Sequence, residues 1–202
     1  MPITTLQEVD IAHGDALVGG GAAYVDLRST DEYLEVHIPG SLGLLYEFGP
    51  GMATRARDCL PLSLPLLLLS SPEVDMNNAA AALRGKGFTV VGRVDDALQQ
   101  WATAHGTPAS TEIVEGPDAP EGTVLDVADP GVIPQDGARR IPLDHLWTRA
   151  EELADQSPVV VAAGYGVRAA LAVGMLERAG VGEVVLWKTR ARPPRRRYEA
   201  YG

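Results

Sequence analysis

The stretch SPVVVAAGYGVRAALAVGMLERAG, residues 157–180, decides the fold. A run of three valines at 159–161 leads into a Gly-Tyr-Gly turn at 164–166, and a helical spacing of apolar residues then continues to Gly180. Unbroken valine runs are typical of strands buried in parallel sheets, and glycine is favoured where a helix ends. The order strand, turn, helix therefore indicates an α/β fold, whose ligands bind beyond the carboxyl ends of the strands.

The second half of the chain resembles the first. The corresponding segments are 22–29 with 122–129, 36–44 with 138–146, and 64–71 with 157–164. Such a repeat predicts two similar units. Between them, residues 106–121 are rich in Pro, Gly and acidic residues without apolar periodicity, which is typical of a linker. We therefore expect one domain at 1–105 and a second at 122–202, each near the usual domain size.

Composition narrows the class of protein. The chain of 202 residues is 46% hydrophobic and carries a net charge of −10, which argues against general nucleic-acid binding. The arginine-rich C-terminal tail is expected to be solvated or to face a partner. The N-terminus shows no secretory signal, and prolines interrupt the most apolar stretch, 59–69. We expect a cytoplasmic protein that binds no membrane. A single cysteine excludes an internal disulfide and a Cys-rich metal site, and no metal or cofactor is predicted.

Two segments carry a specific family resemblance. VDLRSTDEYLEVHIPGSLGL, residues 25–44, resembles the first segment of a rhodanese (sulfurtransferase) domain through Asp26, Arg28 and the box formed by His37, Ile38, Pro39, Gly40 and Ser41. Residues 158–180 resemble the strand, loop and helix that form the active site in that family. The resemblance covers most of both halves, and it implies two rhodanese-like domains, each a small, mostly parallel five-stranded sheet flanked by helices. The tandem, together with 47–61, is also similar to rhodanese pairs attached to metallo-β-lactamase-fold hydrolases, although no hydrolase metal motif is present.

The family resemblance implies a chemistry. A cysteine at the end of the strand becomes a persulfide and passes sulfur from a donor such as thiosulfate to an acceptor. Backbone N–H groups surround the sulfur, and an arginine five residues after the cysteine closes the loop. The amides and the helix N-terminus lower the pKa of the thiol, and they also bind the anionic donor and product.

This chain lacks the cysteine at both corresponding positions. Ala163 occupies the position in the second half, followed by the loop Gly164, Tyr165, Gly166 and Val167 and by Arg168 at the arginine position. In the first half Ser70 takes the cysteine position and Asp75 the arginine position, without glycines between them. Asp126 of the second half likewise has no arginine two residues later. Neither copy can form a persulfide at the family position.

Three other residues, Cys59, Ser70 and His37, are considered for a catalytic or a structural role. Cys59, the only thiol, is predicted to be a small buried hydrophobe, the alternative being a reactive thiol whose pKa Arg55 and Arg57 lower. Ser70 would need an adjacent base to act as a nucleophile, and neither His13 nor His37 has an obvious placement for that role. His37 is expected to hold its turn by hydrogen bonds, and Asp26 to pair with Arg28.

Two functions from different classes remain. The first is an inactive rhodanese-like pair that acts as a binding or regulatory module in sulfur metabolism and binds a partner protein, such as a sulfur-handling enzyme, or a small oxyanion. For such a module, residues 163–168 either still form an anion-binding loop or are present only because the strand-to-helix turn requires them. A further possibility is that the first domain only supports the second against a partner. The alternative is sulfur transfer through Cys59 or a partner's thiol, or hydrolysis at Ser70.

Overall fold

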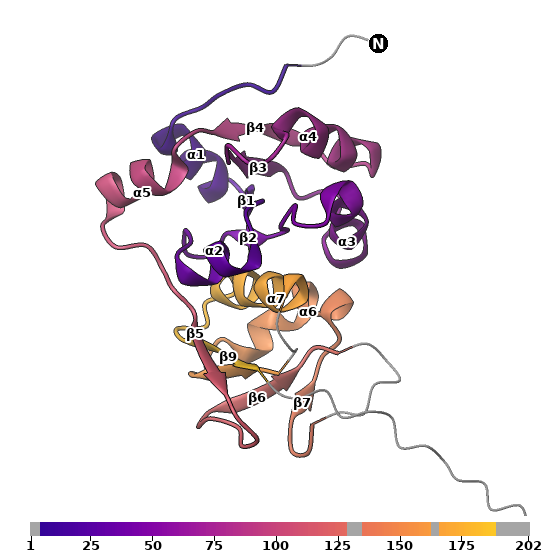
Figure 1. The fold of residues 1–202 in the computed structure, drawn as a ribbon, viewed down its shortest axis with the longest axis vertical. Coiled ribbons are helices and arrows are strands. Elements are labelled where there is room, and N and C mark those ends of the chain that lie inside the picture. Colours follow the sequence, from indigo (N-terminus) through magenta and orange to yellow (C-terminus); the bar gives the residue numbers. More distant parts are fainter. Residues whose placement is uncertain (1–4, 129–134, 163–165, 189–202) are drawn as a thin grey trace, which may run out of the picture.

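The computed structural model describes residues 5–128, 135–162 and 166–188, and these form two β-sheets whose paired strands all run parallel. The strand order is β2-β1-β3-β4 in the first sheet and β5-β9-β8-β6-β7 in the second. Helices flank both sheets (Figure 1). The α/β class predicted from the sequence is confirmed.

The elements of each half follow the expected alternation of strands and helices. In the first half they are α1 (Ile11–Gly19), β1 (Ala23–Asp26), α2 (Thr30–Glu35), β2 (Leu42–Gly43), η1 (Gly49–Gly51), α3 (Met52–Cys59), β3 (Leu66–Leu69), α4 (Met76–Gly85), β4 (Val90–Val94) and α5 (Ala97–His105). In the second they are β5 (Glu112–Glu115), β6 (Thr123–Asp126), β7 (Arg139–Arg140), α6 (Leu143–Arg149), η2 (Ala150–Leu153), β8 (Val159–Val161), α7 (Val167–Arg178) and β9 (Val184–Lys188).

The two sheets differ in strand number. The second has the five strands expected, but the first has four. Beside β4, the N-terminal segment forms only an isolated parallel bridge between Glu8 and Arg93, with Val9 N donating to Arg93 O at 2.9 Å. One bridge is too short to make a strand, so the fifth position of the first sheet is filled by a single contact.

The segment 106–121, predicted as a linker, contains strand β5. This strand pairs with β9 at the edge of the second sheet, with Val114 opposite Trp187. Its four residues are too few to show a periodicity between the flanking prolines and glycines, so the composition hid it. The structure thus joins residues 112–115 to the second sheet, while the domain limits 1–105 and 122–202 stay a prediction.

The N-termini of several helices are capped by side-chain hydrogen bonds. Ser29 and Glu32 form a capping box at α2, in which the Ser29 hydroxyl accepts from the Glu32 backbone N–H and the Glu32 carboxylate accepts from the Ser29 backbone N–H. Asp10 caps α1 and Asp75 caps α4 in the same general way. These short polar residues explain why the helices begin where they do after each strand.

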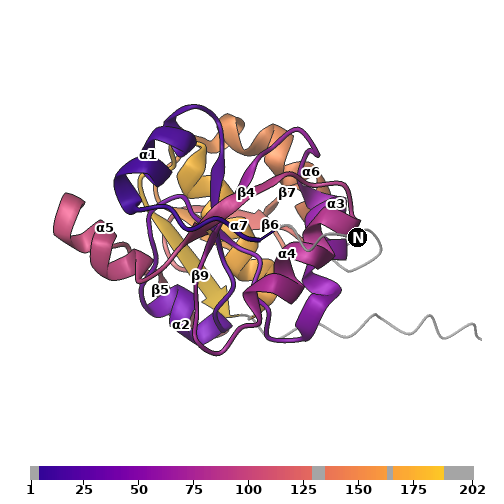
Figure 2. The ribbon, with the colours of Figure 1, turned by 90° about the horizontal axis from the view of Figure 1, so that it is seen from above.

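Helix α7 is the structural centre of the molecule. Eight consecutive residues of this helix, 169–176, are buried, as expected for a helix enclosed on all sides. It packs on the first half so closely that a Cβ added at Gly174 would lie 2.2 Å from the Ser41 carbonyl oxygen. Figure 1 shows α7 between the strands of the second sheet and the elements of the first half, and Figure 2, seen from above, shows it near the middle of the molecule.

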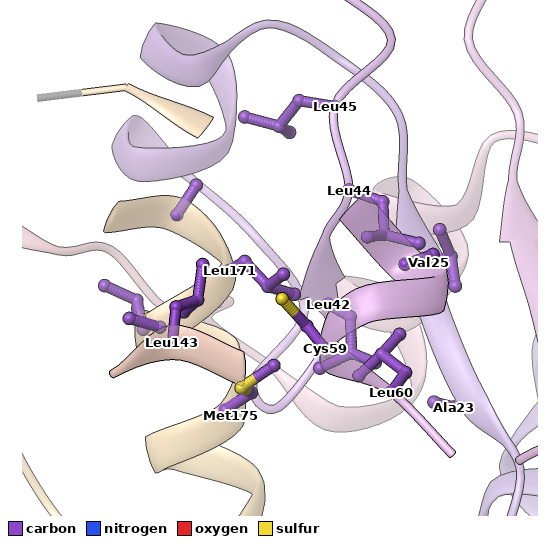
Figure 3. Close-up of a cluster of buried hydrophobic side chains, with 14 of the residues drawn as sticks. Ala23, Val25, Leu42, Leu44, Leu45, Cys59, Leu60, Leu143, Leu171 and Met175 are labelled. Carbon is purple, nitrogen blue, oxygen red and sulfur yellow. The ribbon is translucent and has the colours of Figure 1, made fainter. Parts of the chain in front are cut away.

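The two halves share one hydrophobic core. Figure 3 shows Leu42 and Cys59 of the first half beside Leu143, Leu171 and Met175 of the second, and all belong to the same buried cluster. Because α7 contributes to both sides, the relative position of the halves is fixed by core packing rather than by a surface contact. None of the described helices is long and apolar enough to cross a membrane.

Candidate functional site

The junction between β8 and α7 carries the loop predicted to bind an anion. Ala163, Gly164 and Tyr165 lie outside the described residues. Gly166 is the N-cap of α7, with a φ of 130° that favours glycine, and no side chain caps the helix there. Arg168 lies in the first turn of the helix, and its Nη2 donates to the Val127 carbonyl oxygen at 3.2 Å.

An open cavity of about 600 Å³ lies in front of this helix start. Its walls come from both halves of the chain: Arg55, Asp58 and Cys59 on α3, Asp144 on α6, and Val167 and Arg168 on α7. The volume is in the range usual for small-molecule sites. The cavity exists only because α3 of the first half packs against α6 and α7 of the second.

Arg55 is the most informative residue of the cavity. Its Nη2 donates to the carbonyl oxygens of Leu44 at 3.0 Å and Leu45 at 3.4 Å, whereas its buried Nε–H has no partner among the described residues. Burial lowers the pKa of Arg55, and the nearby positive charge of Arg168 lowers it further, whereas the Cys59 thiol acts in the opposite direction. In the described part of the chain, no carboxylate forms an ion pair with Arg55. Arg55 is thus a partly buried cation with a free donor at the cavity wall, an arrangement that suits an anionic ligand.

Cys59 lies in the wall of the cavity, although only 7% of its surface is exposed. Burial raises the pKa of its thiol to about 11, the charges of Asp58 and Asp144 add to the rise, and Arg168 and Arg55 partly offset it. At neutral pH the sulfur is therefore protonated, and a protonated thiol is a poor nucleophile. Its burial beside leucines (Figure 3) confirms the prediction that Cys59 is a buried residue.

The corresponding junction in the first half, from β3 to α4, is built differently. The Ser70 hydroxyl donates to the Asp95 carboxylate, which also binds Arg93 at 2.9 Å. These two hydrogen bonds, that from Arg93 being the stronger influence, lower the pKa of Asp95. Asp75 caps α4 by accepting from Asn78 N at 3.0 Å. Carboxylates thus occupy the place where an anion would bind, and Ser70 contacts an aspartate rather than a histidine base.

A smaller cavity of about 230 Å³ lies at this first junction, and Asp26, Arg28 and Ser70 contribute to its lining. Arg28 and Asp26 form the expected pair, with Nη2 and Oδ2 2.7 Å apart, and the same Nη2 donates to the Val36 carbonyl oxygen at 2.6 Å. In the second half, Asp126 has no such arginine; its carboxylate accepts instead from the Ala128 backbone N–H at 2.8 Å.

The box around His37 lies between the halves rather than at either junction. His37 is fully buried and contacts the Glu177 carboxylate of α7, and the Gly40 backbone N–H donates to the same carboxylate at 2.9 Å. Pro39 precedes Gly40, whose φ of +75° favours glycine at this turn. The His37 ring nitrogens thus contact Tyr33 and Glu177, whereas the Ser70 hydroxyl contacts Asp95.

Sequence reasoning found part of this arrangement and missed part of it. It identified Arg168, and it placed Arg55 near Cys59 in the sequence, but it did not predict that both arginines would line one cavity. It also missed Glu177, because a single acidic residue near the end of an apolar helix is ordinarily read as a solvent-facing residue. Among the described residues, no cluster of three or more His, Cys, Asp or Glu side chains is arranged to hold a metal ion.

Two solved structures resemble the chain. A thiosulfate sulfurtransferase from Pseudomonas aeruginosa matches over 94% of this chain and 46% of its own length, with 16% identity and a TM-score of 0.39. SseA from Escherichia coli, described with the rhodanese fold and the mechanism of 3-mercaptopyruvate sulfotransferases, matches over 93% of this chain and 100% of its own, with 17% identity and a TM-score of 0.39. This chain thus spans about half the length of the first.

No protein-family model matches the chain, and no curated protein sequence matches it either.

Proposed function

We propose that the chain is a rhodanese-like tandem protein that has no sulfurtransferase activity of its own and binds an anion, or an acidic group of a partner protein, in the cavity between α3, α6 and α7. The observation that carries the proposal is Arg55 in the wall of this cavity, which also holds Arg168, Asp58 and Asp144: Arg55 is partly buried, its Nε–H has no partner among the described residues, and no described carboxylate forms an ion pair with it. A bound oxyanion would supply Arg55 with both an acceptor and a counter-charge.

The missing nucleophile supports a binding role. Ala163 and Ser70 stand at the two cysteine positions, so the family's persulfide has no site there. The alternative route through Cys59 gains no support, because this thiol is buried and its pKa is raised to about 11. A role in sulfur metabolism, with a sulfur-handling enzyme as partner, follows from the family resemblance and belongs to the same proposal.

Anion titration of matched arginine variants tests the proposal. Sulfate and thiosulfate would be titrated by calorimetry into the wild type and into Arg55→Gln, Arg168→Gln and Arg57→Gln. Arg57 lies on the same helix as Arg55 but is exposed and does not line the cavity, which makes it the control. We expect the first two changes to weaken binding about tenfold each, the usual effect of losing one charged hydrogen bond, and R57Q to have no effect. Equal effects of all three would show only general charge attraction and would overturn the proposal.

A sulfur-transfer assay tests the second part of the proposal, that the chain has no sulfurtransferase activity of its own. With thiosulfate as donor and cyanide as acceptor, the wild type is expected to give no turnover above buffer. Turnover that disappears in Cys59→Ala would establish the alternative function through Cys59. Turnover that persists in Cys59→Ala would also contradict the proposal, because it would require a nucleophile other than a thiol of this chain.

A further inference from the structure

Both ring nitrogens of His37 face hydrogen-bond acceptors. His37 Nδ1 lies 2.8 Å from the Tyr33 carbonyl oxygen, and Nε2 lies 3.0 and 3.1 Å from the two carboxylate oxygens of Glu177. Both partners can only accept hydrogen bonds when the carboxylate is ionised. A neutral imidazole has one N–H and can satisfy only one of them, whereas an imidazolium has two. The ring stacks on Tyr33 at 4.3 Å between centroids, which holds it in this orientation.

The proton of the pair belongs on the ring rather than on the carboxylate. A free glutamic acid loses its proton near pH 4.3, about two units below a free histidine, so a proton shared by the two resides on the imidazole. The Gly40 N–H donates to the same carboxylate. His37 is 0% exposed, and the Glu177 side chain is 17% exposed.

The charged groups on the surrounding elements are arranged consistently with a cation at His37. On the side of the first half, Asp26 and Arg28 neutralise each other, and Tyr33 stays neutral because burial raises its pKa well above its usual value. On the side of the second half, Glu112, Glu177 and Glu183 line one cavity of about 330 Å³. The nearest cation there, Arg178, directs its guanidinium over the ring of Trp147.

His37 also lies where three parts of the chain meet. Its backbone pairs with Ala109, in the segment that leads to β5, by two hydrogen bonds of 2.9 Å. Its ring contacts α2 through Tyr33 and α7 through Glu177. Glu177 stands at one end of α7, and Arg168, in the wall of the anion cavity, stands at the other. A change at the His37 contact can therefore be transmitted along a single rigid helix.

We propose that His37 is an imidazolium when the two halves are docked, and that loss of one of its two ring protons removes the ion pair with Glu177, leaves one ring nitrogen without a proton for its acceptor, and loosens α7 against the first half. The docked form holds one more proton than the loosened form, so raising the pH through the range where histidines titrate favours the loosened form. The consequence for the anion cavity, a lower anion affinity at higher pH, rests on the function proposed above.

The first test reads the state of the ring directly. Nitrogen-15 NMR of histidine-labelled protein at about pH 6 resolves the ring nitrogens, and the single variants His13→Gln, His105→Gln and His145→Gln identify the other three histidines. We expect the remaining signal, from His37, to show both ring nitrogens protonated. One protonated nitrogen at that pH would overturn the proposal. This measurement needs no change at the contact itself, so it holds even where a variant of the contact fails to fold.

The second test follows the docking by hydrogen exchange of residues 33–45 and 167–178. The wild type, Glu177→Gln and Glu183→Gln are compared at the same pH, which cancels the intrinsic effect of pH on exchange. Glu183 lines the same cavity but does not contact His37, and its side chain is exposed, so it is the control. At about pH 6 we expect E177Q to exchange about tenfold faster than the wild type, and at about pH 8 the difference to disappear. A difference that stays the same at both pH values would contradict the proposal, as would an equal effect of E183Q.

The third test concerns the cavity. Sulfate affinity is expected to fall several-fold between about pH 6 and pH 8 in the wild type and to vary much less in E177Q. Equal pH dependence in both proteins would refute the link between the contact and the cavity. If sulfate binds at neither pH, the proposed anion function fails, while the ring state and the exchange data still decide the protonation of His37.

Discussion

The two strand-to-helix junctions of the molecule occupy equivalent places in the repeat but have different side chains at the helix start. At β3–α4, Asp75 caps the helix and Asp95 receives the Ser70 hydroxyl. At β8–α7, a glycine caps the helix, and Arg168 faces the cavity together with Arg55. A side-chain carboxylate at a helix start satisfies the same N–H groups that an external anion would bind. The first junction therefore holds a carboxylate at its helix start, whereas no described side chain caps the start of α7.

The difference in burial between the two helices matters as much as their charge. Helix α4 packs on the first sheet through three buried residues, whereas α7 is buried along most of its length between the halves. A buried helix fixes the residues at its start in space. Preorganisation of this kind lowers the cost of binding a ligand.

The largest expected effect comes from breaking the packing of α7. Gly174→Ala places a Cβ 2.2 Å from the Ser41 carbonyl oxygen and 2.9 Å from the Tyr33 hydroxyl, so the backbone of one half has to move. We expect the free energy of unfolding to fall by about 3 kcal/mol, the upper end for overpacking a core. Urea unfolding followed by circular dichroism measures it.

The matched control is Gly85→Ala in α4, where nothing lies within 4 Å of the added Cβ. A helical Gly→Ala change without a clash is expected to be neutral or to stabilise by up to about 1 kcal/mol. If both variants lose the same stability, the close packing of α7 is not what distinguishes the two helices.

The sequence predicted the fold well because its signals were local. The valine run at 159–161, the leucine run at 66–69, and the glycines Gly87 and Gly180 that follow α4 and α7 each reported a single element. The pairing of Asp26 with Arg28 and the burial of Cys59 were also within reach, because both depend on residue type and near neighbours.

What could not be predicted depends on contacts between distant residues. The meeting of Arg55 with Arg168 and that of His37 with Glu177 bring together residues more than a hundred positions apart. The small residues of α7, including Gly174, did hint at a helix approached closely from several sides, but not at which element approaches it. Strand β5 was missed because four residues between turn-forming segments show no pattern.

The next effect, in order of size, concerns thiols introduced at the two junctions. Ala163→Cys puts a thiol three residues before Gly166 and five before Arg168, and this thiol is expected to have a pKa below the usual value of about 8.5 because a helix start and an arginine favour the thiolate. Ser70→Cys puts a thiol beside Asp95 and near Asp75, whose negative charges disfavour the thiolate. We expect A163C to react with iodoacetamide at pH 7 at least about tenfold faster than S70C.

Cys59 provides an internal reference for both variants, because its raised pKa makes it slow to react at pH 7. Incubation with thiosulfate should add one sulfur atom to A163C and none to S70C or the wild type. Mass spectrometry of the intact protein measures this addition. Equal reactivity of the two introduced thiols would mean that the junctions do not differ electrostatically, and it would remove the basis for an anion site at the second.

The smallest effect tests whether the first junction really supplies its own anion. Asp75→Ala removes the cap of α4, and we expect it to lower the free energy of unfolding by about 1 kcal/mol, whereas Asp75→Asn keeps an accepting oxygen and should lose only part of this. With the carboxylate gone, sulfate at high concentration should stabilise D75A more than the wild type, because the uncapped N–H groups of α4 become available to it. If sulfate stabilises D75A and the wild type equally, Asp75 is only a structural cap, and the lack of anion binding at the first junction has to be attributed to Asp95 instead.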